Sequence, residues 1–412
     1  MKRKTSEAVG HNDYFTGLNA LMKQKGPGQP VLVLDLDILD RNIEKLKMQI
    51  GDLSRFRLVV KSLPCKNLIH HILENTRTNK LMVFHRPFLN LAVNAFPESD
   101  ILLGKPLPVQ ALETYYRVKD ASPPSSGNPR IQWLIDSAQR LDQYHVFARR
   151  MGLKMNINIE IDVGLHRGGV PSPEELAPLL KTIYEDPIHL NLTGFMGYDP
   201  HVAKSGKLLI PRTVALARVT WRYKKFVRYL EKEFPALYSP HLTFNGAGSP
   251  TFAMYRKKEI LNDVSAGSAL VKPSDLDLKT LKGYETAIFI ATPVLKKRAG
   301  IKIPFLEPLS GLVQKIKSQW RTTLFIYGGD WKSVPLSPKG LVVNSLYGRS
   351  TNQEMMNGPE HVALEVDDYV FLRPTQSESV MLQFGDLFVV RGNKYVGRWP
   401  VFSQDSRSKQ GF

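Results

Sequence analysis

The sequence predicts an α/β protein in which a (β/α)8 barrel is followed by a C-terminal antiparallel β domain. From residue 31 to about 270, short β-rich runs alternate with amphipathic helical stretches, which favours a parallel sheet with helical crossovers. About eight such units favour a closed barrel. After about residue 285 the runs are short, turns separate them and no long helix intervenes. We therefore expect an N-terminal extension at 1–30 that packs on the barrel or the β domain, a barrel at 31–284 and a β domain at 285–412.

Each expected barrel element follows from its hydrophobic pattern. The first apolar run covers residues 31–35 and leads into 40–49, where apolar residues recur at helical spacing. A second run approaches Lys61, and helical residues 66–75 follow it. Long helices are expected at 137–151 and 214–232. Further strand-like runs lie at 81–84, 101–103, 131–135, 157–163, 192–196 and 242–244.

The expected β domain rests on a second set of short runs. They lie at 286–293, 322–327, 361–366, 369–372 and 387–390. No Gly/Ser-rich linker separates them from the barrel, so tight docking is expected in place of a tethered module.

Composition excludes several classes of protein. Hydrophobic residues make up 42% and charged residues 23% of the 412-residue chain, as in ordinary soluble globular proteins. The net charge is +18, but Lys and Arg are scattered and their densest clusters, at 222–225 and 296–298, are short. Because no basic surface with interleaved aromatic residues is evident, we expect no nucleic-acid partner. Attraction of small anions, such as phosphates and amino-acid carboxylates, is a sufficient use for the charge.

Cysteine usage and the chain's start favour the cytoplasm. Cys65 is the sole cysteine, which excludes an intramolecular disulfide and a Cys-rich zinc site. We expect it to be a packed thiol. The basic start is followed by polar residues in place of a secretory apolar run, and no apolar stretch reaches the roughly 20 residues of a membrane-spanning helix. A cytoplasmic location without a membrane partner is therefore expected.

Lys61 is the most informative candidate residue. It ends the apolar run that begins after Arg57, just before Pro64. At the C-terminal mouth of a barrel strand its amine could be partly withdrawn from water and form an imine with the aldehyde of pyridoxal phosphate (PLP). The alternative for this segment alone is a strand that ends in a solvated lysine.

Three other apolar runs also end in polar residues. The C-terminal ends of barrel strands face one shared pocket, so these residues are expected to converge. Arg167 could hold a substrate carboxylate or contact a cofactor ring, or it could form a surface ion pair. Tyr198 could lie against a planar ring or fill the barrel mouth.

The fourth strand end is the candidate phosphate site. Small residues let backbone N–H groups approach an anion, and the hydroxyls of Ser249 and Thr251 could add donors. The alternative is an ordinary Gly-rich turn. The residues proposed for cofactor binding are Asn245, Gly246, Ala247, Gly248 and Ser249.

Together, these segments resemble the fold-type III PLP enzymes, specifically the D-threonine aldolase and D-serine dehydratase-like group related to alanine racemase. The opening strand at 31–37 is similar to the family's "LVLDLDALDRNI", residues 160–167 to "EIDVGxxRxGV" and residues 245–252 to its phosphate loop "GGGTPT". The resemblance implies that Lys61 is the Schiff-base lysine, that Tyr198 supports the PLP ring and that Arg167 fixes the ring or the substrate carboxylate.

The sequence departs from the family pattern at two places. Leu58 and Val59 stand where the lysine motif "RPHxKTH" has Pro and His. Where metal-dependent members carry "PNHxC" in the β domain, this chain has Gln376 and Glu378 in the segment 374–378. Gln376 is a poor ligand for a soft metal, while Glu378 could bind a hard cation such as Mg²⁺ or Mn²⁺. Whether a divalent metal is used stays open.

The resemblance also implies a reaction class and an assembly. The substrate would be an amino acid, best described as a D- or β-hydroxy amino acid, and the reaction an aldol cleavage, an elimination with deamination or a racemisation. A homodimer is implied, because in this fold type the β domain of one subunit often completes the pocket of another. The rival is a non-catalytic PLP carrier, which resembles the same barrel but lacks the β domain.

Overall fold

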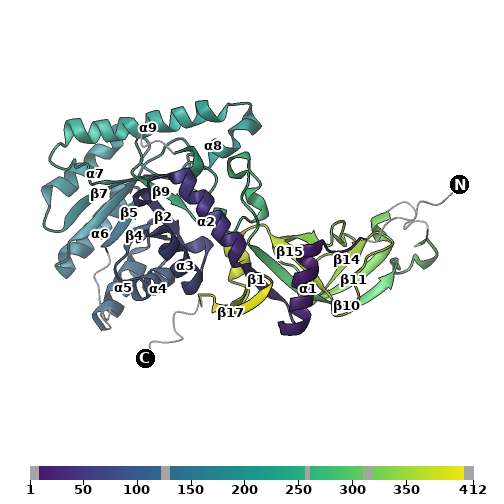
Figure 1. The fold of residues 1–412 in the computed structure, drawn as a ribbon. Coiled ribbons are helices and arrows are strands. Elements are labelled where there is room, and N and C mark those ends of the chain that lie inside the picture. The colour runs from purple at the N-terminus through teal and green to yellow at the C-terminus, as the bar shows by residue number, and fades with distance from the viewer. Residues whose placement is uncertain (1–8, 122–129, 256–259, 310, 312–317, 403–412) are drawn as a thin grey trace. The chain divides into compact units, whose positions relative to one another are not determined.

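The computed structural model describes residues 9–121, 130–255, 260–309, 311 and 318–402, and it divides into two compact units (Figure 1). We call residues 42–270 with 278–284 and Phe402 the barrel unit. Residues 9–41, 271–277 and 285–401 form the sheet unit. The boundary between the units falls within helix α2 (Leu36–Ile50).

Eight parallel strands close the barrel of the barrel unit, which confirms the predicted fold. Their order around the barrel follows the sequence, and the helices that connect them lie outside the strands (Figure 1). The strands are β2 (Phe56–Val59), β3 (Lys80–Val83), β4 (Asp100–Leu103), β5 (Arg130–Ile135), β6 (Met155–Glu160), β7 (Leu190–Gly197), β8 (Thr243–Gly246) and β9 (Asp263–Ala266). The helices are α3 (Lys66–Thr76), α4 (Arg86–Ala95), α5 (Val109–Ala121), α6 (Ala138–Met151), α7 (Pro173–Glu185), α8 (His201–Lys204) and α9 (Arg212–Glu233).

Local sequence signals account for the ends of the connecting helices. Helix α6 begins after Ser137, whose side chain accepts a hydrogen bond from the backbone N–H of Arg140. It ends at Gly152, whose φ of 61° is the left-handed conformation that glycine adopts without strain. Helix α7 begins after Ser172, with Pro173 at its first position, where the missing N–H costs nothing.

The sheet unit contains one nine-stranded sheet. Its main path runs β13-β14-β11-β10-β1-β16-β17, while β15 pairs with β10 and β12 pairs with β15. All these pairs are antiparallel except β1 with β16. The strands are β1 (Val31–Asp35), β10 (Ile288–Ala299), β11 (Thr322–Tyr327), β12 (Ser333–Ser337), β13 (Val342–Val343), β14 (Gln353–Gly358), β15 (Tyr369–Pro374), β16 (Asp386–Arg391) and β17 (Lys394–Pro400). The short helix α11 (Ser377–Met381) lies between β15 and β16.

The N-terminal helix α1 (Asp13–Lys25) belongs to the sheet unit. Asn19 accepts a hydrogen bond from the backbone N–H of Tyr369 at 2.8 Å, and Lys23 forms an ion pair with Asp368 at 2.8 Å. Phe15 packs on Phe371, with ring centres 4.9 Å apart. The extension expected at 1–30 therefore covers the sheet through its described residues.

The barrel begins later than the sequence suggested. We expected residues 31–35 to be its first strand, but β1 pairs with β10 and β16 in the sheet unit, and the barrel begins at β2. All five residues of β1 are buried, so its continuous apolar sequence does not distinguish a barrel strand from a buried strand of another sheet. Its partners lie more than 250 residues later in the chain, and no local signal specifies them.

Two other expectations about the β domain need correction. Residues 361–366 form no strand, since Val362 makes only an isolated bridge with Val9. Strand β14 was not expected either, because its residues QEMMNG lack the β-branched and aromatic side chains that favour strands. The expectation for Cys65 is confirmed: it is fully buried, and burial raises the pKa of its thiol to about 11.

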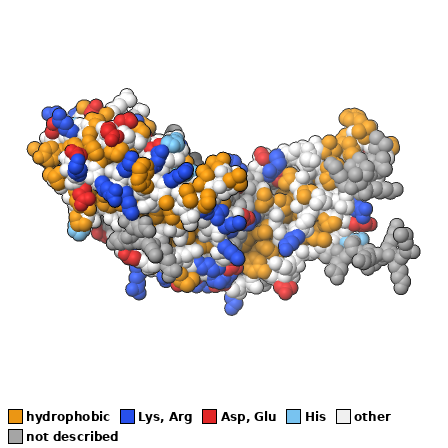
Figure 2. Space-filling model, turned by 90° about the horizontal axis from the view of Figure 1, so that it is seen from above, with side chains coloured by type: hydrophobic (Ala, Val, Ile, Leu, Met, Phe, Trp, Pro, Cys, Tyr) orange, Lys and Arg blue, Asp and Glu red, His pale blue; other side chains and the backbone are white. Residues whose placement is uncertain are grey.

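The described residues also bear on membrane insertion and on the distribution of charge at the surface. Among the described residues, no helix combines the length and the apolar character needed to cross a bilayer. On the face drawn in Figure 2, Lys and Arg side chains are interspersed with acidic, neutral and hydrophobic ones.

Candidate active site

Lys61 lies directly after β2, at the barrel end where the C-terminal ends of the strands open. It occupies a single 3-10 turn (Val60–Ser62) whose other two residues are buried. Its Nζ lies 4.7 Å from the centre of the Phe84 ring, which follows β3. The half-buried amine is thus held against an aromatic face, where a cation is favoured.

The ends of β8 and β9 approach the turn that carries Lys61. A Cβ at Gly267, after β9, would lie 2.7 Å from the carbonyl oxygen of Val59, so only glycine allows this close approach. Ser249 Oγ accepts hydrogen bonds from the backbone N–H groups of Gly267 and Ala269, at 3.1 and 3.0 Å. The loop after β8 is therefore fastened beside the strand end of Lys61.

The loop of residues 246–249 has a backbone that side chains would obstruct. Ala247 has a φ of 63°, a left-handed conformation that a non-glycine residue adopts at a cost and that is frequent at functional sites. A Cβ at Gly248 would lie 2.7 Å from Cε2 of Tyr198, and one at Gly246 would lie 2.7 Å from Cδ1 of Leu261. Gly246 and Gly248 therefore have to be glycine, and the backbone at Gly248 lies close against the Tyr198 ring.

Tyr198, which follows β7, links this loop to Arg167. The guanidinium of Arg167 lies 4.9 Å from the centre of the Tyr198 ring, a cation–π contact. Contacts thus run from Arg167 through Tyr198 and the 246–249 loop to Gly267 and the strand end of Lys61. The candidate residues at the ends of β2, β7 and β8 and in the loop after β6 are therefore linked by a continuous series of contacts.

Asp162 shapes the loop that carries Arg167. Its Oδ1 accepts hydrogen bonds from the backbone N–H groups of Gly164 at 2.8 Å and His166 at 3.0 Å. Its Oδ2 lies 2.6 Å from Nδ1 of His166, whose φ of 55° turns the chain sharply. Burial opposes ionisation of Asp162, but the hydrogen bonds from His166 and Gly164 prevail and lower its pKa. An ionised Asp162 therefore fixes the turn at residues 164–166, which directly precedes Arg167.

Asp199 is a structural residue that the sequence analysis missed. It is fully buried and accepts hydrogen bonds from Thr251 Oγ1 at 2.7 Å and Tyr255 Oη at 2.5 Å. Burial raises the pKa of Asp199 to about 6, although these hydrogen bonds oppose the shift. Thr251, which we considered as a phosphate donor, instead joins the loop after β8 to the end of β7.

Glu160, the last residue of β6, is a titratable group at the barrel mouth. Its altered pKa was not evident from the sequence. Burial, together with the charge of Asp136, raises its pKa to about 7, and Arg167 only partly offsets the shift. A carboxyl group that titrates near neutral pH at a barrel mouth can both donate and accept a proton, as a general acid or base must.

Substitution Glu160→Gln is expected to make the protein more stable at pH 8, by an amount on the order of 2 kcal/mol. The folded-state pKa of Glu160 is raised, so between about pH 4.3 and 7 the folded state holds a proton that the unfolded state has lost, and its stability falls as pH rises through that window. Glutamine removes this loss. Chemical denaturation at pH 4 and pH 8 measures the difference, and the exposed Glu231→Gln is the control. A gain of the same size at both pH values would contradict the argument.

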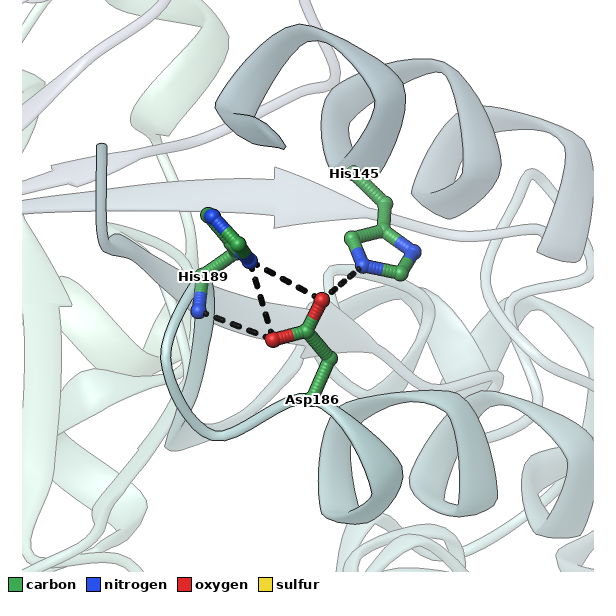
Figure 3. Close-up of side chains that lie close together, drawn as sticks. All are labelled: His145, Asp186 and His189. Carbon is green, nitrogen blue, oxygen red and sulfur yellow. Dashed lines mark hydrogen bonds and ion pairs between the residues drawn. The ribbon is translucent and has the colours of Figure 1, made fainter. Parts of the chain in front are cut away.

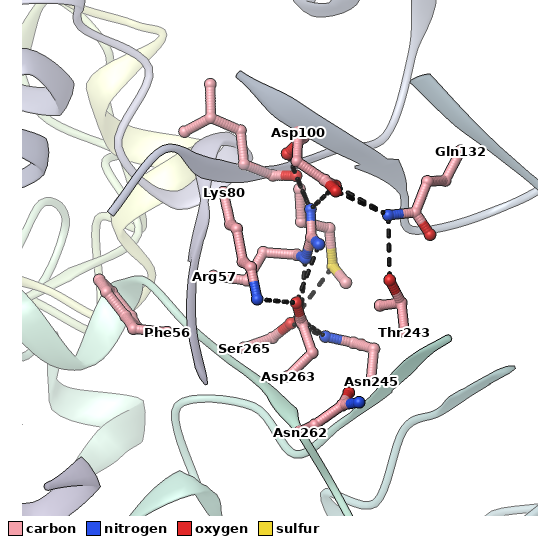
Figure 4. A network of polar contacts seen from close by, with 12 residues as sticks. Phe56, Arg57, Lys80, Asp100, Gln132, Thr243, Asn245, Asn262, Asp263 and Ser265 are labelled. Carbon is pink, nitrogen blue, oxygen red and sulfur yellow. Dashed lines mark hydrogen bonds and ion pairs between the residues drawn. The ribbon is translucent and has the colours of Figure 1, made fainter. Parts of the chain in front are cut away.

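Asn245 differs from the other candidates because its side chain points into the barrel. Its Nδ2 donates to Asp263 Oδ1 at 2.6 Å and to Ser265 Oγ at 2.8 Å. It belongs to the buried polar network drawn in Figure 4, whose centre is Arg57. The amide of Asn245 thus supports the strands beneath the mouth, and the contact it can offer a ligand is through its backbone.

The family follows from comparison with known proteins. The family model described as alanine racemase, N-terminal domain, matches residues 34–275, which is more than half of the chain. This chain belongs to the alanine racemase N-terminal domain family. The fold-type III resemblance stated from the motifs is thereby confirmed. A search of curated protein sequences found no match.

Solved structures similar to this family member extend over both units. D-threonine aldolase from Filomicrobium marinum superposes with a TM-score of 0.72 at 17% identity, covering 91% of this chain and 97% of that one. D-threo-3-hydroxyaspartate dehydratase from Delftia sp. gives a TM-score of 0.67 at 15% identity and covers 90% and 97%. An alanine racemase from Clostridium difficile gives 0.63 at 16% identity and covers 90% and 98%. At these identities the similarity establishes the shared fold.

The metal candidates of this family member lie in the sheet unit, around helix α11. Gln376 precedes the helix, and its Nε2 donates to Asp275 Oδ2 at 3.3 Å. Glu378 lies in the first turn of the helix. Within the described residues, Glu378 is not part of a group of three His, Cys, Asp or Glu side chains close enough to share an ion. Its role as a ligand stays a prediction.

Proposed function

We propose that this chain is a PLP-dependent enzyme that acts on an amino acid, with Lys61 as the residue that binds PLP covalently. The observation that carries the proposal is the series of contacts from the strand end of Lys61 through the 246–249 loop to Tyr198 and Arg167. It combines an amine, a bare backbone loop, an aromatic ring and a guanidinium, which are the groups that an aldehyde, a phosphate and a planar ring require.

The residues present fit PLP. A Cβ at Gly246 or Gly248 would meet its neighbours at 2.7 Å, so these two positions have to be glycine, and their backbone N–H groups would be donors that no side chain of their own covers. Gly246, Ala247, Gly248 and Ser249 would hold the phosphate, and Tyr198 would support the ring. Arg167 would contact the ring or the substrate carboxylate.

When bound, PLP supplies an electron sink that lowers the cost of breaking a bond at the substrate Cα. The chain's residues then determine which bond breaks. Lys61 Nζ would move a proton on one face of the substrate, and Glu160 is suited to exchange a second proton near neutral pH. Phe84 limits water around the amine by covering one side of it.

The proposed substrate is a D- or β-hydroxy amino acid, and the reaction an aldol cleavage, an elimination with deamination or a racemisation. Two of the similar structures are named for D-amino acids with a hydroxyl on Cβ, D-threonine and D-threo-3-hydroxyaspartate, and a third is an alanine racemase. A homodimer is part of the same proposal. The alternative function is a non-catalytic PLP-binding protein, against which the extensive sheet unit argues.

The proposal is tested by adding PLP to the purified protein, reducing with borohydride and mapping the modified peptide by mass spectrometry. We expect one cofactor per chain, attached to Lys61. Lys66, five residues later and exposed on α3, is the internal control for non-specific labelling. Labelling of Lys66 or of many lysines would overturn the assignment. Specific labelling of Lys61 without conversion of any amino acid in a broad D- and L-panel would favour the carrier.

A further inference from the structure

A cluster of two histidines and an aspartate lies on the barrel unit, outside the candidate active site. His145 comes from α6, Asp186 directly follows α7 and His189 directly precedes β7. Figure 3 shows both imidazole rings directed at the carboxylate of Asp186. Within the described residues, this is the group of three His, Cys, Asp or Glu side chains close enough to hold one ion, with their ligand atoms all within 4.8 Å of one another.

The carboxylate is shared between the two imidazoles. Nε2 of His145 lies 2.8 Å from Oδ2 of Asp186, and Nδ1 of His189 lies 2.9 Å from both carboxylate oxygens. The two rings have centres 6.5 Å apart. In a tetrahedral site with bonds of 2.0–2.1 Å, two ligand atoms are about 3.3 Å apart, so the three groups need to move by at most about 1.5 Å to share an ion.

The backbone that carries these ligands is well ordered by local contacts. Residues Tyr144 and Ala148, on either side of His145, are fully buried and fix α6. The turn at 186–189 is closed by a hydrogen bond from the backbone N–H of Leu190 to the carbonyl oxygen of Asp186 at 3.0 Å. The side chains themselves are about one-fifth exposed, so an ion can reach them from solvent without unfolding.

We propose that His145, Asp186 and His189 form a binding site for a divalent transition-metal ion, with Zn²⁺ as the expected occupant. Two imidazole nitrogens and one carboxylate oxygen are a ligand set that suits zinc and its neighbours, whereas Mg²⁺ and Ca²⁺ prefer oxygen alone. Each imidazole would carry its proton on the ring nitrogen that faces away from the carboxylate, which leaves a lone pair for the ion. Water would complete the coordination on the exposed side.

The position of the site indicates a structural role. His189 precedes the N-terminal end of β7 and Tyr198 follows its C-terminal end, so the eight-residue strand separates them by roughly 25–30 Å. An ion there is too distant to take part in chemistry at Lys61. Instead it would fasten α6 to the turn between α7 and β7, segments 41 residues apart in the chain. The inference is independent of the proposed function.

The test is a titration of metal-free protein, prepared with a chelator, with Zn²⁺ by calorimetry and with Co²⁺ by visible absorption. We expect one site per chain and a rise in Tm of about 3–5 °C at a Zn²⁺ concentration about 100-fold above the dissociation constant. His145→Gln and His189→Gln should each weaken binding at least about tenfold and remove the rise. His70→Gln is the control, since this exposed histidine on α3 pairs with Glu74, is not part of the cluster and should change neither result.

Each outcome decides the question. Binding that His70→Gln and His145→Gln reduce equally would reflect scattered surface histidines and would overturn the site. Absence of Zn²⁺ binding in the unaltered protein would mean that the three residues form only a hydrogen-bonded link between α6 and the turn. Because a misfolded variant would also lose the ion, the circular dichroism spectrum and the chemical denaturation curve of each metal-free variant must match those of the unaltered metal-free protein.

Discussion

Lys61→Ala is expected to reduce kcat/KM for the proposed amino-acid substrate by about 10²–10⁴-fold or more. The side chain has two proposed roles, the covalent link to PLP and the movement of a proton on one face of the substrate, and alanine removes both. The phosphate loop at 246–249 does not depend on Lys61, so the variant should still bind PLP, but reversibly. Steady-state kinetics, together with borohydride labelling, measures both effects.

Two further variants separate the role of the amine from that of its charge. Lys61→Arg keeps a cation against the Phe84 ring but cannot form the link, so it should be as inactive as Lys61→Ala. Lys66→Ala removes an exposed lysine from α3 and should leave the kinetics unchanged. Undiminished turnover in Lys61→Ala would refute the proposed mechanism, because the reaction would then proceed without either role assigned to Lys61.

The sequence predicted which residues lie at the barrel mouth, but not the hydrogen bonds that hold the loops there in place. Lys61, Tyr198 and Arg167 each follow an apolar run, and the rule that strand ends converge was enough to bring Tyr198 and Arg167 together. The roles of Asp199 and Thr251 could not be found in the same way. Their hydrogen bond joins residues 52 positions apart, and nothing in either segment indicates the other.

The directions in which side chains point could not be predicted from the sequence either. Asn245 lies in the motif that the sequence analysis assigned to the cofactor, but its position in β8 directs its amide into the barrel, where Asp263 and Ser265 accept its hydrogen bonds. The same applies to Glu160, whose raised pKa depends on burial and on Asp136 from the neighbouring strand end. Such environments depend on which strands become neighbours and on their register, which a single sequence does not specify.

The environment of Arg57 was equally hidden in the sequence, although Arg57 directly precedes the apolar run that ends at Lys61. Its side chain is fully buried and forms a bidentate ion pair with Asp263, at 2.8 and 2.9 Å (Figure 4). Its Nη1 also lies 2.9 Å from Asp100 Oδ1. Burial disfavours the charge of Arg57, yet the two carboxylates prevail and raise its pKa. The network lies at the end of the barrel opposite Lys61, where residues serve stability.

Arg57→Met is expected to destabilise the protein by about 3–5 kcal/mol, the largest effect on folding that we predict. Methionine fills much of the space but leaves Asp263, which is buried, without its bidentate partner; Lys80, at 3.3 Å, compensates only in part. Chemical denaturation measures the loss. Arg130→Met is the matched control, because Arg130 is half exposed and lies 3.6 Å from Asp100, so its removal should cost about 1 kcal/mol or less.

A second substitution should rescue much of this loss. Asp263→Asn in the Arg57→Met background removes the uncompensated charge while its side-chain oxygen can still accept from Asn245. The pH dependence gives an independent check. Burial opposes ionisation of Asp263, but Arg57 lowers its pKa in the unaltered protein, so Asp263 stays ionised from pH 5 to 8. Without Arg57, burial is opposed only by the nearby Lys80 and the hydrogen bond from Asn245, so we expect that pKa to rise. The single variant should therefore recover stability as pH falls toward 5. If the cost of Arg57→Met were instead independent of pH and of Asp263→Asn, lost packing and not an unpaired charge would be its cause.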